Sequence, residues 1–387
     1  EERTEQIKNS GEIILELPGD SVQALSWEYQ SRTLGFHRQG DAWLFDEDEA
    51  FPVNGEKIDG LLEQFQAFGA AFVIEAVSDY GQYGLDDPVC TIRLQTESKT
   101  YEILLGDYSK MDSQRYVSLG DGNVYLVKND PLDQFDADLS DMIDHDEIPA
   151  FTRAQAIRFT GAESYEILYR EGGSDTHRAA DVYFAQQGGG SLPLDTSRVE
   201  AYLSAITSLG LTDYVTYNAT PQELETYGLA SPELTVTVEY PAESDGGEGT
   251  GGTLLLHLSR DPKELEQAQK AAEKEQADPE KEGETGEETV TAYARVGESQ
   301  IIYRISAQDY KALMAASCDS LRHTEVLPAD FADLRQLDFS LEGAVYTFTS
   351  EKKGGERTYY YQQEELETAS LQAALEGLEA TGFTGEQ

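Results

Sequence analysis

Cysteine and basic side chains are scarce in this chain of 387 residues, and each scarcity excludes a class of protein. Two cysteines cannot make the disulfide framework of a small secreted domain, and they lack the C-x-x-C spacing of zinc or redox sites. Lys and Arg total 28 against 74 Asp and Glu, which gives a formal net charge of −46. That charge repels the phosphates of nucleic acids and the anionic surface of a bilayer, so we expect neither as a direct partner.

Long apolar runs are missing as well. No stretch reaches the roughly 18 apolar residues that a membrane-spanning helix needs, and no signal peptide is recognisable. The sequence opens on charged residues without an initiator methionine. We expect residues 1–20 to be an N-terminal tail that follows a membrane anchor absent from this sequence.

One helical pattern occurs three times, with apolar side chains at i, i+3, i+4, i+7 and i+10, the spacing that places them on one face of a helix. The second copy lies 141 residues after the first and the third a further 172 residues on. The positions are Ile58, Leu61, Leu62, Phe65 and Phe68; Val199, Tyr202, Leu203, Ile206 and Leu209; and Leu371, Ala374, Leu375, Leu378 and Thr381. Each copy is followed by a glycine, Gly69, Gly210 or Gly382, which we expect to end the helix in a left-handed conformation.

The surroundings of the helix repeat too. A hairpin is predicted before each copy, over 24–28 with 33–38, 156–160 with 164–169 and 336–340 with 344–350. After the first two copies come Tyr83-Gly84-Leu85-Asp86-Asp87-Pro88 and Tyr227-Gly228-Leu229-Ala230-Ser231-Pro232. Four alternating strands follow each, over 91–95, 100–105, 115–119 and 124–127, then over 234–240, 253–258, 292–296 and 301–305. The third copy has neither a Tyr-Gly-Leu segment nor these strands.

The repeat defines the domain organisation. We expect module 1 over 21–150, module 2 over 151–328, and a truncated module 3 over 329–387 that packs on module 2. An acidic, low-complexity stretch over 261–289 interrupts module 2, and we expect a solvated helix over 262–276 followed by a disordered loop. The fold class is therefore α+β: tandem modules of antiparallel sheet, each with one principal amphipathic helix, plus a C-terminal half-module.

The Tyr-Gly-Leu-x-x-Pro segment at Tyr83 to Pro88, with the strands that follow it, resembles the bacterial domain-of-unknown-function 4340 family. The resemblance covers most of module 1 and recurs more weakly in module 2, where the glycine of the second strand is missing near Leu258. It implies an extracytoplasmic protein held by an N-terminal membrane segment, and some members are encoded beside ABC-transporter components. It implies no catalytic residues.

The repeated motif has a structural explanation and a functional alternative. Gly84 and Gly228 suit a tight turn with positive φ, Leu85 and Leu229 can fill the space between helix and sheet, and Pro88 and Pro232 set φ before the next strand. Tyr83 and Tyr227 can cap the core. The alternative is a loop that contacts a ligand, so these eight residues are the candidate site.

No motif points to a metal or cofactor. The five histidines form no H-x-x-x-H or H-E-x-x-H pattern. His145 and His323 occupy equivalent junctions, where we expect hydrogen bonds of a linker, with a pH switch or a ligand as the alternative. Acidic runs at 46–49 and 136–147 lack the order of an EF-hand loop. No nucleotide-binding loop or nucleophile elbow is present.

We therefore expect a non-enzymatic, extracytoplasmic module that binds a protein or envelope component, accessory to an ABC-type transporter, with no cofactor. Two alternatives stay open. One is a carbohydrate-active or peptide-cleaving enzyme, which needs a pocket with two carboxyls about 5 to 9.5 Å apart. The other is a calcium-dependent adhesion module built on the acidic runs. Three adjacent tyrosines, Tyr359 to Tyr361, add an exposed ring for protein or sugar contact or, alternatively, edge-strand packing.

Overall fold

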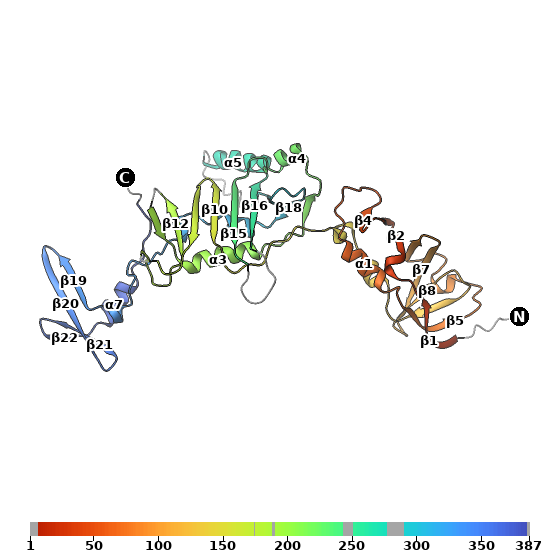
Figure 1. Ribbon diagram of the computed structural model, residues 1–387, viewed down its shortest axis with the longest axis horizontal. Helices are drawn as coiled ribbons and strands as arrows, with labels where there is room; N and C mark the ends of the chain where they lie inside the picture. The colour runs from red at the N-terminus through yellow and green to blue at the C-terminus, as the bar shows by residue number, and fades with distance from the viewer. Residues whose placement is uncertain (1–6, 174, 188–189, 243–250, 277–289, 385–387) are drawn as a thin grey trace. The chain divides into compact units, whose positions relative to one another are not determined.

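Two nine-stranded sheets and one four-stranded sheet contain the strands of this computed structural model, and every pairing in them is antiparallel (Figure 1). The structure describes residues 7–384 except 174, 188–189, 243–250 and 277–289. The chain divides into unit 1, Glu1–His145, and unit 2, Asp146–Gln387. Separate helices and antiparallel sheets confirm the α+β class.

Unit 1 contains the first nine-stranded sheet, in the order β1-β5-β9-β8-β7-β6-β2-β3-β4. Its strands are β1 Ile7–Leu15, β2 Val22–Tyr29, β3 Arg32–Gln39, β4 Ala42–Phe45, β5 Phe68–Ile74, β6 Cys90–Thr96, β7 Thr100–Ser109, β8 Gln114–Ser118 and β9 Val124–Val127. Helix α1, Gly55–Glu63, begins at Asn54, whose side chain accepts the N–H of Lys57, and buries Ile58, Leu61 and Leu62. The short helix α2, Leu132–Phe135, buries Phe135 against Trp27 and Phe65.

Unit 2 repeats this arrangement in a second nine-stranded sheet, in the order β13-β12-β11-β10-β15-β16-β17-β18-β14. Its strands are β10 Ala156–Gly161, β11 Tyr165–Tyr169, β12 Tyr183–Gln187, β13 Gly190–Pro193, β14 Tyr214–Thr216, β15 Leu234–Tyr240, β16 Gly252–Arg260, β17 Ala292–Val296 and β18 Ile302–Ile305. Helix α3, Thr196–Thr207, buries four apolar side chains and runs along the sheet (Figure 1). The other helices are α4 Pro221–Thr226, α5 Pro262–Gln276 and α6 Ala307–Met314.

The two large sheets share one pairing scheme. In unit 1 the hairpin β2–β3 joins the later strands through β2 and β6, with Trp27 opposite Ile92. In unit 2 the hairpin β10–β11 joins them through β10 and β15, with Phe159 opposite Val236. The predicted repeat of hairpin, helix and four strands is therefore present as one topology built twice.

The third sheet, in unit 2, has only four strands, in the order β19-β20-β21-β22. They are β19 Gln336–Leu341, β20 Ala344–Lys353, β21 Glu356–Tyr361 and β22 Glu364–Leu366, followed by helix α7, Ala369–Glu376. No residue of α7 is buried, in contrast to α1 and α3.

The predicted extent of the helices was wrong at their C-terminal ends. Helix α1 ends at Glu63, and Phe68 begins strand β5, which pairs with β1 on one side and β9 on the other. The ring of Phe68 still packs on Phe65, 5.4 Å away, so the apolar spacing continues across a turn. Gly69 lies within β5, and none of Gly69, Gly210 and Gly382 has a positive φ. Sheet pairing on both sides of β5 outweighs the local helical pattern.

Two further segments differ in how far they match expectation. Strand β1 lies within the stretch that was expected to be a tail. Helix α5 has the predicted bounds, whereas the disordered loop predicted after it lies outside the described residues. No helix in the described ranges is long and apolar enough to cross a membrane.

A buried ion pair holds two strands of unit 1 to the loop after β9. Arg115 on β8 donates from Nε to both carboxylate oxygens of Asp130, each at 2.6 Å, and from Nη1 to the carbonyl of Gly106 at 2.6 Å. The two side chains are 9% and 8% exposed. Such a pair is costly to break because the remaining charge stays buried.

We predict that Asp130→Ala lowers the free energy of unfolding by about 3 to 5 kcal/mol in urea titrations. The control is Glu102→Ala, which breaks the ion pair of Glu102 with Arg93 in the same sheet, where both side chains are about half exposed. It should cost no more than about 1 kcal/mol. Equal losses from the two variants would contradict a buried pair at Arg115.

Candidate functional site

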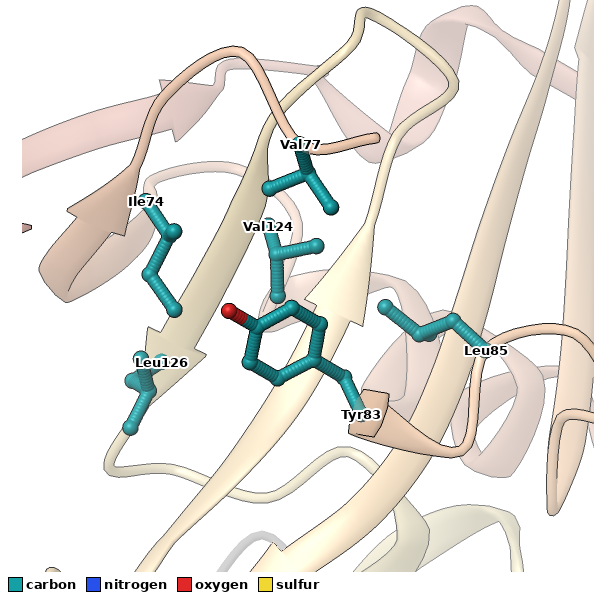
Figure 2. Packing of buried hydrophobic residues seen from close by; sticks show 6 residues of the cluster. All are labelled: Ile74, Val77, Tyr83, Leu85, Val124 and Leu126. Atoms are coloured by element: carbon teal, nitrogen blue, oxygen red, sulfur yellow. The ribbon is translucent and has the colours of Figure 1, made fainter. Parts of the chain in front are cut away.

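The first Tyr-Gly-Leu motif forms a tight turn against the sheet of unit 1. A 3-10 turn over Gly81–Tyr83 leads to Gly84, which has φ +68°. Tyr83 and Leu85 are 8% and 4% exposed, and they pack with Ile74, Val77, Val124 and Leu126 (Figure 2). The ring of Tyr83 lies 4.9 Å from that of Tyr116.

The second motif reproduces the same turn. Tyr227 ends helix α4, and Gly228 has φ +74°. Leu229, 5% exposed, packs with Tyr293 and Ile302, and the rings of Tyr227 and Tyr293 lie 4.8 Å apart. Pro88 and Pro232 each stand two residues before the next strand, β6 or β15. A ligand-contacting role for either loop stays a prediction.

Both motif glycines press against the neighbouring strand. A Cβ on Gly84 would lie 2.7 Å from Asp107 Cγ, and one on Gly228 would lie 2.5 Å from Ser259 Oγ. Gly106 has equally little space for a side chain, because a Cβ added to it would lie 2.2 Å from the carbonyl oxygen of Tyr83. Ser259 is the counterpart of Gly106 in the second module. Gly106 follows Leu105, which pairs with the first residue of β6, and Ser259 follows Leu258, which pairs with the first residue of β15.

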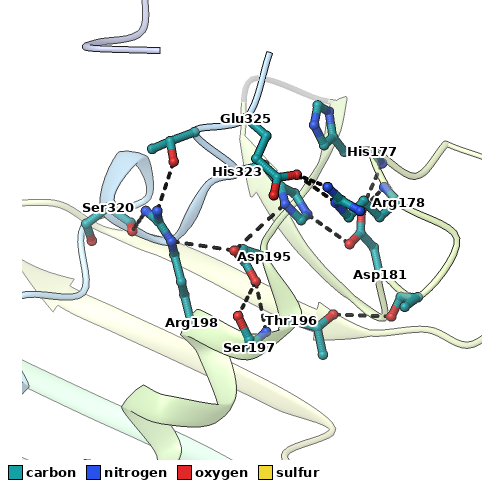
Figure 3. Close-up of polar contacts among 12 residues, drawn as sticks. His177, Arg178, Asp181, Asp195, Thr196, Ser197, Arg198, Ser320, His323 and Glu325 are labelled. Atoms are coloured by element: carbon teal, nitrogen blue, oxygen red, sulfur yellow. Dashed lines mark hydrogen bonds and ion pairs between the residues drawn. The ribbon is translucent and has the colours of Figure 1, made fainter. Parts of the chain in front are cut away.

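A second group of residues, the histidine cluster, lies in unit 2 and was not predicted. It joins the loop before β12, the start of α3 and the chain after α6 (Figure 3). Its members are His177, Arg178, Asp181, Asp195, Arg198, His323 and Glu325. Residues 177–198 and residues 323–325 are at least 125 residues apart in sequence (323 − 198 = 125), so no local spacing could reveal the cluster.

Asp181 and His323 form the centre of the histidine cluster. Asp181 is 3% exposed, and its Oδ2 accepts the backbone N–H groups of His177 and Arg178 at 2.8 and 2.7 Å. Its Oδ1 lies 2.8 Å from Nε2 of His323, whose side chain is 8% exposed. This contact confirms the hydrogen bond expected for His323 and identifies its partner.

Asp195 connects the cluster to helix α3. It is the N-cap of the helix and accepts the N–H of Ser197 at 3.0 Å, while its Oδ2 lies 3.8 Å from Nδ1 of His323. Burial alone would raise the pKa of this carboxyl, but hydrogen bonds from Ser197 and the charge of His323 outweigh it and hold the pKa below its ordinary value. Arg198 donates to the carbonyl of Ser320 and to Thr324.

His177 and Glu325 complete the cluster. The rings of His177 and His323 are stacked, with centroids 4.6 Å apart. Nε2 of His177 is buried and has no hydrogen-bond partner among the described residues. Oε2 of Glu325 accepts two hydrogen bonds from Arg178, one from Nε at 2.7 Å and one from Nη2.

The acidic runs do not form an equivalent group. Within the described ranges, His177, His323 and Glu325 are the one set of three His, Cys, Asp or Glu residues whose ligand atoms lie within 4.8 Å of one another. Calcium binding by the acidic runs stays a prediction. A cavity of about 560 Å³ beside α6 is lined by Arg260, Gln308, Tyr310, Lys311 and apolar side chains, and none of the described residues that line it is a carboxylate.

Comparison with known proteins gives one result. A family model described as a domain of unknown function (DUF4340) matches the chain over residues 43–186 and again over 186–387. The two matches confirm the resemblance that the Tyr-Gly-Leu segments indicate. No curated protein and no solved structure matches the chain.

The left-handed turn yields a stability prediction. Gly84→Ala should lower the free energy of unfolding by more than the roughly 1 to 2 kcal/mol of backbone strain, because the new Cβ also meets Asp107. Gly120→Ala is the control, since Gly120 has φ +74° and open space around it. Urea unfolding of both variants measures the difference, and equal losses would show that the close approach is absent.

The lowered pKa of Asp195 yields a pH prediction. A carboxyl whose pKa is depressed by folding stabilises the protein fully above its ordinary pKa of about 3.9 and loses that contribution as the pH falls through the lowered value. Asp195→Asn keeps an N-cap acceptor and removes the titration. The stability difference between wild type and this variant should shrink as the pH falls from about 5 through the lowered pKa. A difference that does not change with pH would contradict the charged Asp195.

Proposed function

The chain belongs to the DUF4340 family, and we propose that it is a non-enzymatic extracytoplasmic module that binds a protein of the cell envelope. The apolar face of the third sheet is the observation that carries this proposal. The extracytoplasmic location and the accessory role beside an ABC-type transporter rest on the family resemblance of the Tyr-Gly-Leu segments.

One face of the third sheet is apolar and aromatic. Residues directly opposite one another on paired strands share a face, so Leu337 with Phe348, Phe339 with Tyr346, and Leu341 with Ala344 lie together. Tyr361 joins them through ring contacts with Tyr346 and Phe348. The opposite face presents Gln336, Asp338, Ser340, Val345, Thr347 and Thr349.

This apolar face is partly exposed, whereas the second module buries its equivalent. In unit 2 the pair Phe159 and Tyr165 is 3% and 8% exposed, and Tyr202 of α3 lies 5.6 Å from Phe159. In the third sheet Tyr346, opposite Phe339, is 38% exposed and Leu341 is 64% exposed. Exposed apolar clusters on an otherwise highly charged protein are typical of protein-binding surfaces.

The tyrosine run contributes little exposed surface. Tyr359 is 7% exposed and packs on Phe331, 4.8 Å away, while Tyr360 and Tyr361 are half-buried. The exposed apolar side chains belong instead to β19 and β20. We therefore assign the contact with a partner to Leu341 and Tyr346.

Leu341→Asp tests this assignment, and Val345→Asp is its matched control. Leu341 and Val345 are 64% and 67% exposed on the same strand pair but lie on opposite faces. In crosslinking and pull-down from envelope extracts, a partner captured by wild type should be retained by Val345→Asp and lost about tenfold or more by Leu341→Asp. Capture that is unchanged in Leu341→Asp, or lost equally in both variants with unchanged thermal melting, would contradict the proposal.

A further inference from the structure

The histidine cluster contains a polar atom that the fold leaves unsatisfied. Nε2 of His177 is buried without a hydrogen-bond partner among the described residues. An imidazole nitrogen buried in this way costs free energy unless something binds it. One ligand atom each of His177, His323 and Glu325 lies within 4.8 Å of the other two.

The set of side chains has the chemistry of a metal site. Two imidazoles and one carboxylate are the ligands that Zn²⁺ prefers in sites with an open fourth position. Bonds of about 2.1 Å place tetrahedral ligands about 3.4 Å apart, so the separations between the ligand atoms must shorten by at most about 1.4 Å. His177, His323 and Glu325 lie outside the helices and named strands, where such adjustment is least costly. The stacked His177 ring must rotate to face the ion.

An outer partner for a metal-binding histidine is already in place. Asp181 is buried, is fixed by two backbone N–H groups, and lies 2.8 Å from Nε2 of His323. A carboxylate that accepts one N–H of an imidazole orients the ring and makes its other nitrogen a better ligand. That other nitrogen, Nδ1, faces Asp195 at 3.8 Å, which is beyond hydrogen-bond distance.

The charges around the group favour a cation. Asp181, Asp195 and Glu325 supply three carboxylates, whereas Arg178 and Arg198 supply two guanidinium groups. Both bonds from Arg178 to Glu325 end on Oε2, so Oε1 is the oxygen that can bind an ion. With neutral histidines, the three carboxylates and two guanidinium groups therefore leave the cluster with a net charge of 2 − 3 = −1.

We propose that His177, His323 and Glu325 bind a divalent transition-metal ion of the zinc class, with Asp181 as the outer partner of His323. Bound metal would join the loop before β12 to the chain after α6 and so stabilise unit 2. This site goes beyond the proposed protein binding, because no residue of the third sheet takes part in it.

The test is calorimetric titration of the full chain, stripped with EDTA, with ZnCl₂ in the presence of excess Mg²⁺ and Ca²⁺. The hard cations occupy the many surface carboxylates, so a remaining saturable event reports the histidine site. We expect one ion per chain, a raised melting temperature, and the visible absorption of tetrahedral Co²⁺ when Co²⁺ replaces zinc.

Two variants make the result specific. His177→Gln and Glu325→Gln should each weaken the binding at least tenfold, while metal-free melting temperatures stay close to wild type for at least one of them. His37→Gln is the control, because His37 pairs with Asp46 at 2.7 Å in unit 1, outside the cluster. No saturable binding in wild type, or binding unchanged in both variants, would overturn the site.

Discussion

A backbone turn that presses against a neighbouring strand is the constraint on which each complete module depends. Gly84 and Gly228 adopt positive φ where a side chain would collide with the strand beside them. The turn directs a tyrosine and a leucine into the sheet, where the tyrosine meets a second tyrosine from a later strand. In each unit, this contact between two tyrosines therefore joins the segment after the principal helix to one of the four strands that follow it.

Among the described residues, the third sheet lacks a helix that buries its apolar face, and this explains why part of that face is exposed. In the second module, Tyr202 from α3 covers Phe159, and β15 pairs with the outer side of β10. The third sheet has the same aromatic pairing on β19 and β20 but no buried residue on α7. Its apolar side chains Leu341 and Tyr346 are consequently more exposed than Phe159 and Tyr165 of the second module.

Sequence periodicity predicted the elements that depend on local pattern. The hairpins and the four strands after each Tyr-Gly-Leu segment lie where alternation predicts them. Helix α5 lies where a composition rich in Glu, Lys, Ala and Gln predicts a solvated helix. Strand β5 was missed because Phe68 continues a helical spacing, and only pairing with β1 and β9 determines its conformation. The histidine cluster was missed for a related reason, since His177 and His323 meet through the fold and share no motif.

The central claim is that the same module occurs twice in complete form and a third time as a half-module whose sheet is not covered by a helix of the described residues. Native-state hydrogen exchange of the full chain tests this claim. Amides of β10, which is paired on both sides and has half of its residues buried, should exchange close to the global unfolding rate of their sheet. Amides of β19 should exchange orders of magnitude faster, because most of its residues are exposed and, among the described residues, only strand β20 pairs with it. Protection of β19 equal to that of β10 would contradict the account.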